Sequence, residues 1–141
     1  KALAVFHGAE EEKAWKYTEY RIGKMYAAGL GTEQDYLQAA DWLTPSADEN
    51  YKYAQYSLGG LYYHGKGVDQ DHETAFTLYT RSADQDFPYA SFELGKMLRD
   101  GIGCVKNQQD SDRRFKEAFL GFVALDVKRQ ILANSNVKLF L

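Results

Sequence analysis

The stretch Tyr56-Ser-Leu-Gly-Gly-Leu-Tyr-Tyr-His-Gly-Lys-Gly67 contains a pattern that occurs three times in this chain at a spacing of 36 residues. The two related stretches are Tyr20-Arg-Ile-Gly-Lys-Met-Tyr-Ala-Ala-Gly-Leu-Gly31 and Phe92-Glu-Leu-Gly-Lys-Met-Leu-Arg-Asp-Gly-Ile-Gly103. Nine of the 12 glycines fall into three columns, which are Gly23, Gly59 and Gly95, then Gly29, Gly65 and Gly101, and finally Gly31, Gly67 and Gly103. Self-similarity with a period of about 20 to 50 residues is the signature of a repeat protein.

The columns predict a helix–turn–helix unit. Apolar residues such as Leu58, Leu61 and Tyr62 recur at helical spacing. A glycine inside a helix costs about 1 kcal/mol relative to alanine, so the column of Gly59 predicts a paired helix so close that a Cβ atom would block it. The Gly-x-Gly pairs are expected to end each first helix (helix A). A column of short polar side chains is then expected to cap each second helix (helix B), at Asp35, Asp71 and Asn107.

The columns also predict helix boundaries. We expect the A helices near residues 14–28, 52–64 and 88–100, and the B helices near residues 36–49, 72–85 and 108–125. Asn50 and Asp86 are expected to cap the next A helix, with Pro88 in its first turn. Residues 1–13 are expected to end a preceding helix, and residues 126–141 to form a further helix that ends near Asn134. Pro45 lies inside a predicted B helix and predicts a kink there.

These elements predict an all-α protein, a right-handed α–α superhelix (solenoid) of about three 36-residue repeats plus flanking helices. One domain is expected over residues 1–141, with repeats at about 17–52, 53–88 and 89–124 and flanking helical segments at 1–16 and 125–141. Stacking is required because a single unit cannot bury its own apolar face. The chain begins with Lys1 rather than Met, which suggests a piece of a longer protein.

Composition argues against several classes of partner. The net charge is -3, with 17 basic and 20 acidic residues, which gives no electrostatic reason to expect nucleic acid. A local basic patch remains a minor alternative, formed by Lys96, Arg99, Lys106, Arg113 and Arg114. No apolar run approaches the roughly 20 residues that cross a bilayer. The single cysteine excludes an internal disulfide framework. We therefore expect a cytoplasmic monomer.

The sequence offers no catalytic constellation. His64 and His72 flank a Gly-x-Gly loop and can approach each other, but no third metal ligand is evident. Cys104 is interpreted as a half-buried hydrophobic residue rather than a nucleophile. The Gly-x-Gly loops follow helices rather than strands and are not followed by Gly-Lys-Ser/Thr, so they are not phosphate loops. We therefore expect no enzymatic activity, no cofactor and no metal.

At these columns the sequence resembles the Sel-one-like repeat (SLR) family, which is related to the tetratricopeptide repeats. The residues that carry the resemblance are Ala54, Leu58, Gly59, Tyr62, Gly65, Gly67, Val68, Asp71, Ala75, Tyr79 and Ala83. It covers about residues 17–120, and the third repeat departs from the family pattern at Leu98, Cys104 and Phe119. The resemblance implies a non-enzymatic adaptor or scaffold domain of a bacterial protein.

A second resemblance involves three segments, residues 20–26, 29–36 and 115–122. Their sequences are similar to those of the C-terminal repeats of plasmid-mobilisation relaxases of the MobA/MobL type from Gram-positive bacteria. In those proteins a separate N-terminal domain nicks DNA, and no histidine cluster or catalytic tyrosine motif of that kind occurs in this chain. This resemblance implies the alternative function, an accessory domain that aids relaxosome assembly or DNA contact.

By analogy with tetratricopeptide repeats, the A helices are expected to form a concave face that binds a protein or peptide. That face would carry Tyr17, Tyr20, Lys24, Tyr53, Tyr56, Gly60, Tyr63, His64, Tyr89, Phe92, Lys96 and Arg99. As partner-binding residues we select Lys24, Tyr56, Tyr63, His64, Phe92, Lys96 and Arg99. The aromatic column of Tyr20, Tyr56 and Phe92 can equally well pack between repeats. The basic residues on this face suggest a partner of acidic character.

Overall fold

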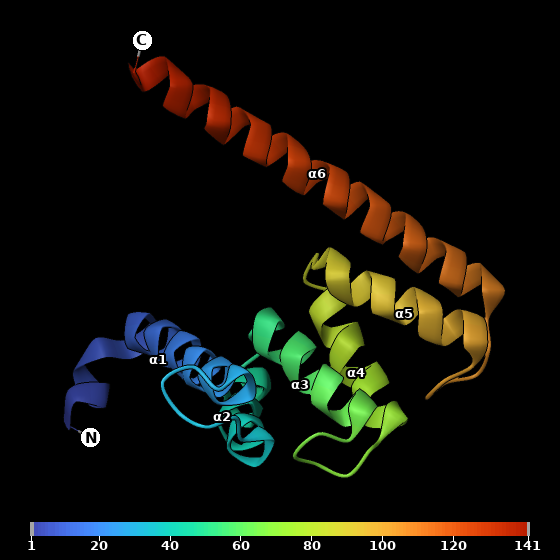
Figure 1. Cartoon of the computed structure of the whole chain (residues 1–141), viewed down its shortest axis with the longest axis horizontal. Helices are drawn as coiled ribbons and strands as arrows, with labels where there is room; N and C mark the ends of the chain where they lie inside the picture. Colours follow the sequence, from blue (N-terminus) through green and yellow to red (C-terminus); the bar gives the residue numbers. More distant parts are fainter. Residues whose placement is uncertain (1, 141) are drawn as a thin grey trace.

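The computed structural model describes the backbone of residues 2–140, where helices are the only regular secondary structure, and the side-chain environment of residue 11 and residues 13–135. The helices are α1 (Ala2–Ala28), α2 (Tyr36–Asp48), α3 (Lys52–His64), α4 (His72–Ala83), α5 (Pro88–Asp100) and α6 (Gln108–Phe140). They form three stacked pairs, α1–α2, α3–α4 and α5–α6 (Figure 1). This architecture confirms the predicted all-α solenoid. No helix in the described residues is both long and apolar enough to cross a membrane.

The short polar residues cap the B helices as predicted. The Asp35 carboxylate accepts from the Gln38 backbone N–H at 3.1 Å, and the Asp71 carboxylate accepts from Thr74 at 3.1 Å. The Asn107 side-chain oxygen accepts from the Asp110 backbone N–H at 3.0 Å. Each cap satisfies one N–H group that would otherwise lack a partner at the helix start.

The glycines inside the A helices are explained by close packing of each helix pair. A Cβ atom on Gly23 would lie 2.7 Å from Leu43 Cγ, and one on Gly95 would lie 2.7 Å from the Phe115 ring. The equivalent atom on Gly59 would lie 3.0 Å from the Tyr79 ring. The bulky B-helix column therefore packs directly onto the A-helix backbone, which confirms the predicted close approach.

Asn50 and Asp86 do not cap the A helices, so that prediction is wrong. The N-terminal cap positions of α3 and α5 are Tyr51 and Phe87, and neither side chain makes a capping hydrogen bond. Asn50 and Asp86 instead have φ values of 66° and 61°. Asn and Asp tolerate the left-handed conformation better than other non-glycine residues, and here they close the turn from each B helix to the next A helix. Pro88 does lie in the first turn of α5.

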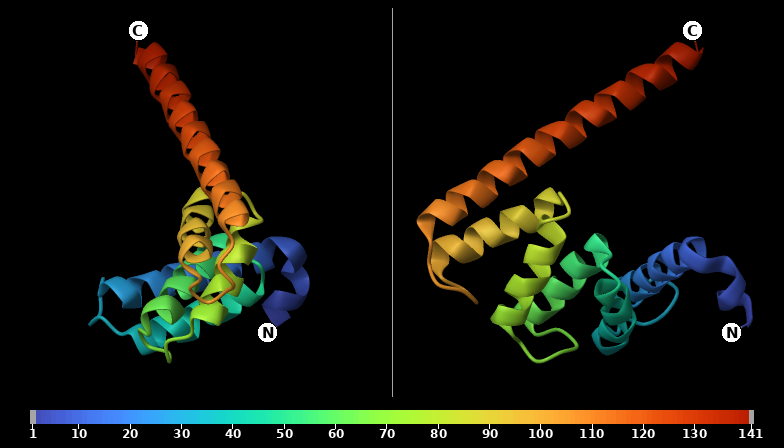
Figure 2. Two further views of the ribbon diagram at one scale, coloured as in Figure 1. Left: turned by 90° about the vertical axis from the view of Figure 1, so that its right-hand side faces the viewer. Right: turned by 180° about the vertical axis from the view of Figure 1, so that it is seen from behind.

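The third B helix does not turn. The predicted break before residue 126 is absent, and α6 continues past Asn134 to Phe140. Phe122 occupies the column of Asn50 and Asp86, and a bulky aromatic residue disfavours the left-handed turn conformation. Residues 123–135 are all exposed, and this half of α6 extends away from the stacked repeats (Figure 2).

Two further predictions concern helix ends and interruptions. Residues 2–13 belong to α1 itself rather than to a separate preceding helix. α2 runs through Pro45 without a break. Pro45 therefore does not end the helix, and the kink at that residue stays a prediction.

Candidate protein-interaction groove

A groove of about 300 Å³ spans the A helices, and B-helix residues contribute to it. Its lining residues are Lys24, Ala27, Tyr36, Leu43, Tyr56, Ser57, Gly60, Leu61, His64, Lys66, Tyr79 and Glu93. Three of the predicted contact residues, Lys24, Tyr56 and His64, therefore come together around one hollow. We call it the Gly60 groove.

Gly60 gives this groove its room. It belongs to a column that holds Lys24 in the first repeat and Lys96 in the third, so the central repeat lacks a long side chain that both neighbours carry. A Cβ atom on Gly60 would lie 3.7 Å from the Tyr79 hydroxyl oxygen, which is an ordinary contact. Packing therefore does not demand glycine here, in contrast to the neighbouring Gly59.

Three tyrosines line the groove, and two of them, Tyr56 and Tyr79, pack against each other. Tyr79 is buried, Tyr56 is half-buried, and their ring centroids lie 5.7 Å apart. Burial raises the pKa of Tyr79, and the nearby Glu93 carboxylate raises it further. Burial also raises the pKa of Tyr56, with a second contribution from Glu93. Both hydroxyls therefore stay protonated near neutral pH and remain hydrogen-bond donors.

The charged side chains of the groove are mainly basic. Lys24, His64 and Lys66 contribute to the lining and are exposed. The Lys66 ammonium lies 5.2 Å from the centroid of the Tyr36 ring, within cation–π range. Glu93 is the acidic residue of the lining, and Lys96 pairs with it at 3.2 Å. The groove therefore presents an excess of positive charge.

The other predicted contact residues lie outside this lining. Tyr63 is half-buried and packs against the rings of both His64 and His72, with centroid distances of 5.1 and 4.8 Å. Phe92 is 42% exposed, packs edge-on against Phe115 at 5.7 Å, and lies 4.8 Å from the Lys96 ammonium. Arg99 makes two hydrogen bonds to Asp100, at 2.9 and 3.0 Å.

A row of aromatic rings crosses all three repeats beside the groove. Its successive centroid distances are 5.4 Å for Tyr20–Tyr51, 5.3 Å for Tyr51–Tyr53, 5.1 Å for Tyr53–Phe87, 5.4 Å for Phe87–Tyr89 and 4.9 Å for Tyr89–Phe122. Tyr56 also joins the row, 5.2 Å from Phe87. Tyr20 and Tyr56 therefore pack between repeats, as the structural interpretation of their column predicts. Another column of exposed tyrosines consists of Tyr17, Tyr53 and Tyr89. None of the three is among the predicted partner-binding residues.

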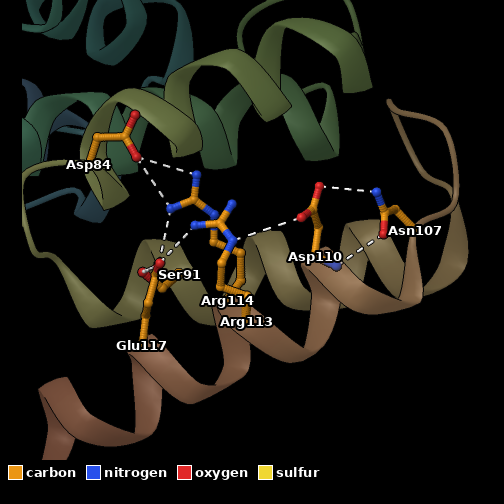
Figure 3. Close-up of polar contacts among 7 residues, drawn as sticks. All are labelled: Asp84, Ser91, Asn107, Asp110, Arg113, Arg114 and Glu117. Atoms are coloured by element: carbon orange, nitrogen blue, oxygen red, sulfur yellow. Dashed lines mark hydrogen bonds and ion pairs between the residues drawn. The ribbon is translucent and has the colours of Figure 1, made fainter.

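A polar cluster in the third repeat was missed by the sequence analysis. Arg114 occupies the column of Trp42 and Leu78, yet it is buried and donates to Asp84 at 3.3 Å and to Glu117 at 3.0 Å (Figure 3). It borders a hollow of about 700 Å³ between α6 and the corner of α4 and α5, whose charged lining residues are Arg113, Arg114, Lys128, Asp84, Asp86 and Glu117. These charges balance, so this hollow attracts neither sign of ligand.

The predicted basic patch is largely neutralised. Four of its five members make ion pairs, which are Lys96–Glu93 at 3.2 Å, Arg99–Asp100 at 2.9 Å, Arg113–Glu117 at 3.0 Å and Arg114–Asp84 at 3.3 Å. Paired side chains have less positive charge to offer to phosphate groups.

Chemically reactive groups are sparse in the described part of the chain. No three His, Cys, Asp or Glu side chains there come together in a way that could hold a metal ion. Cys104 packs against one of the two core clusters, and burial raises the pKa of its thiol. A protonated, half-buried thiol suits the predicted packing role.

Comparison with known proteins supports this architecture. The chain resembles a Sel1 repeat protein from Oxalobacter formigenes, with 25% identity and a TM-score of 0.75 over 81% of this chain and 47% of that one. It also resembles a protective antigen of uropathogenic Escherichia coli that displays an SLR fold, with 27% identity and a TM-score of 0.73 over 77% of this chain and 23% of that one. This chain therefore spans about half of the first relative and a quarter of the second.

A third structure, Helicobacter pylori cysteine rich protein B, matches 79% of this chain and 86% of its own, with 20% identity and a TM-score of 0.63, which supports the fold alone. No curated protein matches the chain. The family model described as Sel1 repeat matches residues 11–51, 52–87 and 88–111. These three consecutive matches cover more than half of the chain, so the chain belongs to the Sel1 repeat family.

Proposed function

We propose that this chain is a protein–protein interaction scaffold that binds a peptide segment of its partner in the Gly60 groove. Sel1 repeat proteins typically act as protein-interaction scaffolds. The observation that carries the proposal is the convergence of Lys24, Tyr56 and His64 on one hollow that packing does not require. Tyrosine and basic side chains around a partly buried depression are typical anchors of a binding site.

The dimensions of the groove suit a peptide side chain. Its volume of about 300 Å³ lies at the small end of the range for ligand sites. Its floor includes Leu43, Leu61 and Tyr79, and its rim carries Lys24, His64 and Lys66. An extended segment can place one side chain into the hollow and run its backbone across the A helices. The exposed rings of Tyr53 and Tyr89 lie on the same A helices and offer further contact area.

Peptides selected from a displayed random library test this proposal. Binding to the unmodified chain should fall by about tenfold or more in Gly60→Gln, because the added side chain fills the hollow, whereas Gly60→Ala should retain binding. Both variants add a Cβ atom at residue 60, and they differ in the length and polarity of the side chain beyond that atom. Selected peptides that bind Gly60→Gln as tightly as the unmodified chain would place the binding surface elsewhere.

The relaxase resemblance remains the alternative function. Of its two implied roles, relaxosome assembly is compatible with a peptide-binding groove, whereas DNA contact would require free basic side chains. Four of the five residues in the basic patch already make ion pairs. Salt-sensitive binding of this chain to plasmid origin DNA, lost in Arg113→Gln, would favour the DNA role.

A further inference from the structure

We infer that the partner segment is acidic and that it places a carboxylate over Gly60, between Lys24 and Lys66. This inference rests on the proposed peptide-binding function of the Gly60 groove and specifies the chemistry of its ligand. It follows from the charge of the lining, from the hydrogen-bond donors in the hollow, and from the glycine that opens it.

The charge of the groove runs against that of the chain. The chain as a whole carries a net charge of -3, yet the groove is lined by the two cations Lys24 and Lys66 against one carboxylate, that of Glu93. The Glu93 carboxylate accepts from the Lys96 ammonium at 3.2 Å, which offsets part of its charge. A basic depression in an acidic protein steers a negatively charged segment toward that site and disfavours cationic segments.

The groove offers several hydrogen-bond donors. The ammonium groups of Lys24 and Lys66 can only donate. The hydroxyl groups of Tyr56 and Tyr79 stay protonated and can donate as well. A carboxylate is the peptide side-chain group that accepts from several donors at once, and charge-assisted hydrogen bonds are the stronger ones.

The repeat alignment explains why an incoming side chain can reach the ammonium groups of Lys24 and Lys66. In the column of Lys24, Gly60 and Lys96, only the central repeat lacks a side chain, so an incoming group replaces a missing lysine rather than displacing one. Lys96 is held by Glu93, which leaves Lys24 as the exposed cation of this column. Lys66 approaches from the loop after α3, where the ring of Tyr36 supports its ammonium at 5.2 Å. A side chain that enters over Gly60 therefore meets cations from two consecutive repeats.

Fluorescence anisotropy with three labelled peptides tests the inference. The peptides alternate alanine with glutamate, with glutamine or with lysine, so they share length and backbone and differ in charge. We expect the glutamate peptide to bind tightest and to weaken as salt is added. Lys24→Gln and Lys66→Gln should each weaken it by about two- to fivefold, the range of single exposed ion pairs. Lys116→Gln, which removes an exposed lysine of α6 outside the groove, should leave binding unchanged.

Gly60→Lys separates a specific groove from general surface charge. It adds a cation to the same face and fills the hollow with the side chain that both neighbouring repeats carry. We expect it to weaken binding of the glutamate peptide, with the helical circular-dichroism spectrum unchanged. Tighter binding by Gly60→Lys would mean that diffuse charge attracts the peptide, and it would overturn the inference.

The outcomes also separate this inference from the proposed function. If library-selected peptides bind Gly60→Gln more weakly but carry no excess of Asp or Glu, the groove binds peptides and the inference of an acidic partner segment is wrong. Equal affinity for the glutamate and glutamine peptides would have the same meaning. If Gly60→Gln affects neither selected peptides nor the glutamate peptide, the proposed function itself fails.

Discussion

The first and second repeats differ at the junction where helix A contacts the turn that follows helix B. In the second repeat, Gln55 donates to the Ala47 carbonyl at 3.2 Å and to the Asn50 side chain at 3.0 Å. Gln85 donates to the Gln55 side-chain oxygen at 2.8 Å. The fully buried amide of Gln55 is thus paired as both donor and acceptor, and this neutral network ties the second repeat to the first.

The same two columns hold carboxylates in the first repeat. Glu19 aligns with Gln55, and Glu49 aligns with Gln85. Glu19 is buried, and its Oε1 atom has no hydrogen-bond partner among the described residues. Burial raises the pKa of Glu19, the charge of Glu49 raises it further, and a hydrogen bond from Trp15 opposes both effects. Burial of a carboxylate that leaves one oxygen without a hydrogen bond is unfavourable for the folded state.

The bonds that lysine and serine side chains make to the backbone recur in the two repeats. Lys16 donates to the Glu49 carbonyl at 2.9 Å, as Lys52 donates to the Gln85 carbonyl at 3.2 Å. Ser46 donates to the Lys16 carbonyl at 2.7 Å. Bonds to the backbone therefore persist from repeat to repeat, because the backbone path repeats whatever the side chains are. The stability of each junction is set by the side-chain pair, and that pair can differ between repeats.

The largest expected effect is a difference in stability between two variants of the same glycine column, one in the second repeat and one in the first. A Cβ atom on Gly67 would overlap the backbone carbonyl of Tyr36 in the preceding repeat, whereas the closest neighbour of one on Gly31 is Met25 Cε at 3.8 Å. Both glycines have positive φ. Gly67→Ala should lower the free energy of unfolding by about 3 kcal/mol or more, and Gly31→Ala by about 1–2 kcal/mol from backbone strain alone. Chemical denaturation measures both, and equal losses would show that contact between repeats does not constrain Gly67.

The second expected effect comes from exchanging the aligned side chains of Glu19 and Gln55 between the two repeats. Glu19→Gln should raise the free energy of unfolding by about 1–3 kcal/mol near neutral pH, because it removes the charge of a buried carboxylate whose Oε1 atom has no partner among the described residues. The mirror change, Gln55→Glu, should lower it by a similar amount because it introduces one. Chemical denaturation of both variants measures the exchange. Losses in both variants would indicate that Glu19 has a partner that glutamine cannot replace.

The pH dependence of this difference has a defined sign. The pKa of Glu19 is raised above its ordinary value of 4.5 in the folded chain, so the folded state binds the extra proton more tightly than the unfolded state. The resulting stabilisation is fully present below 4.5 and is lost as the pH rises through the raised pKa. The advantage of Glu19→Gln should therefore shrink on acidification through that window. An advantage that is independent of pH would contradict the assignment to Glu19.

The repeat columns made most of the fold predictable. The glycines of the A helices, the turn glycines and the B-helix caps each recur three times, and such a recurrence is a signal that one sequence can display. The third B helix shows where this approach stopped. Phe122 stands in a turn column otherwise filled by Asn50 and Asp86, so the signal for a continuous helix was present, but those two residues had been assigned to helix capping.

The candidate site was only partly predictable because pairing between side chains has no sequence period. Lys24, Tyr56 and His64 were selected and do line the groove. Lys96 and Arg99 were selected for the same charge, yet each pairs with a carboxylate, and only the structure shows this. The groove itself comes from a missing side chain. Gly60 lies on the predicted face, but a glycine has no side chain whose chemistry could mark it as part of a binding site.

The smallest expected effect concerns that missing side chain, which is the second difference between the first two repeats. Gly60→Ala should raise the free energy of unfolding by up to about 1 kcal/mol, because alanine favours the helix and its Cβ atom would lie 3.7 Å from the Tyr79 hydroxyl oxygen. Gly59→Ala is the matched control, and it should lose stability because the added atom would lie 3.0 Å from the Tyr79 ring. Thermal unfolding measured by circular dichroism distinguishes the two. A gain at Gly60 means that the chain carries a glycine its fold does not need, as expected if the hollow serves binding, whereas a loss would return Gly60 to the class of packing glycines.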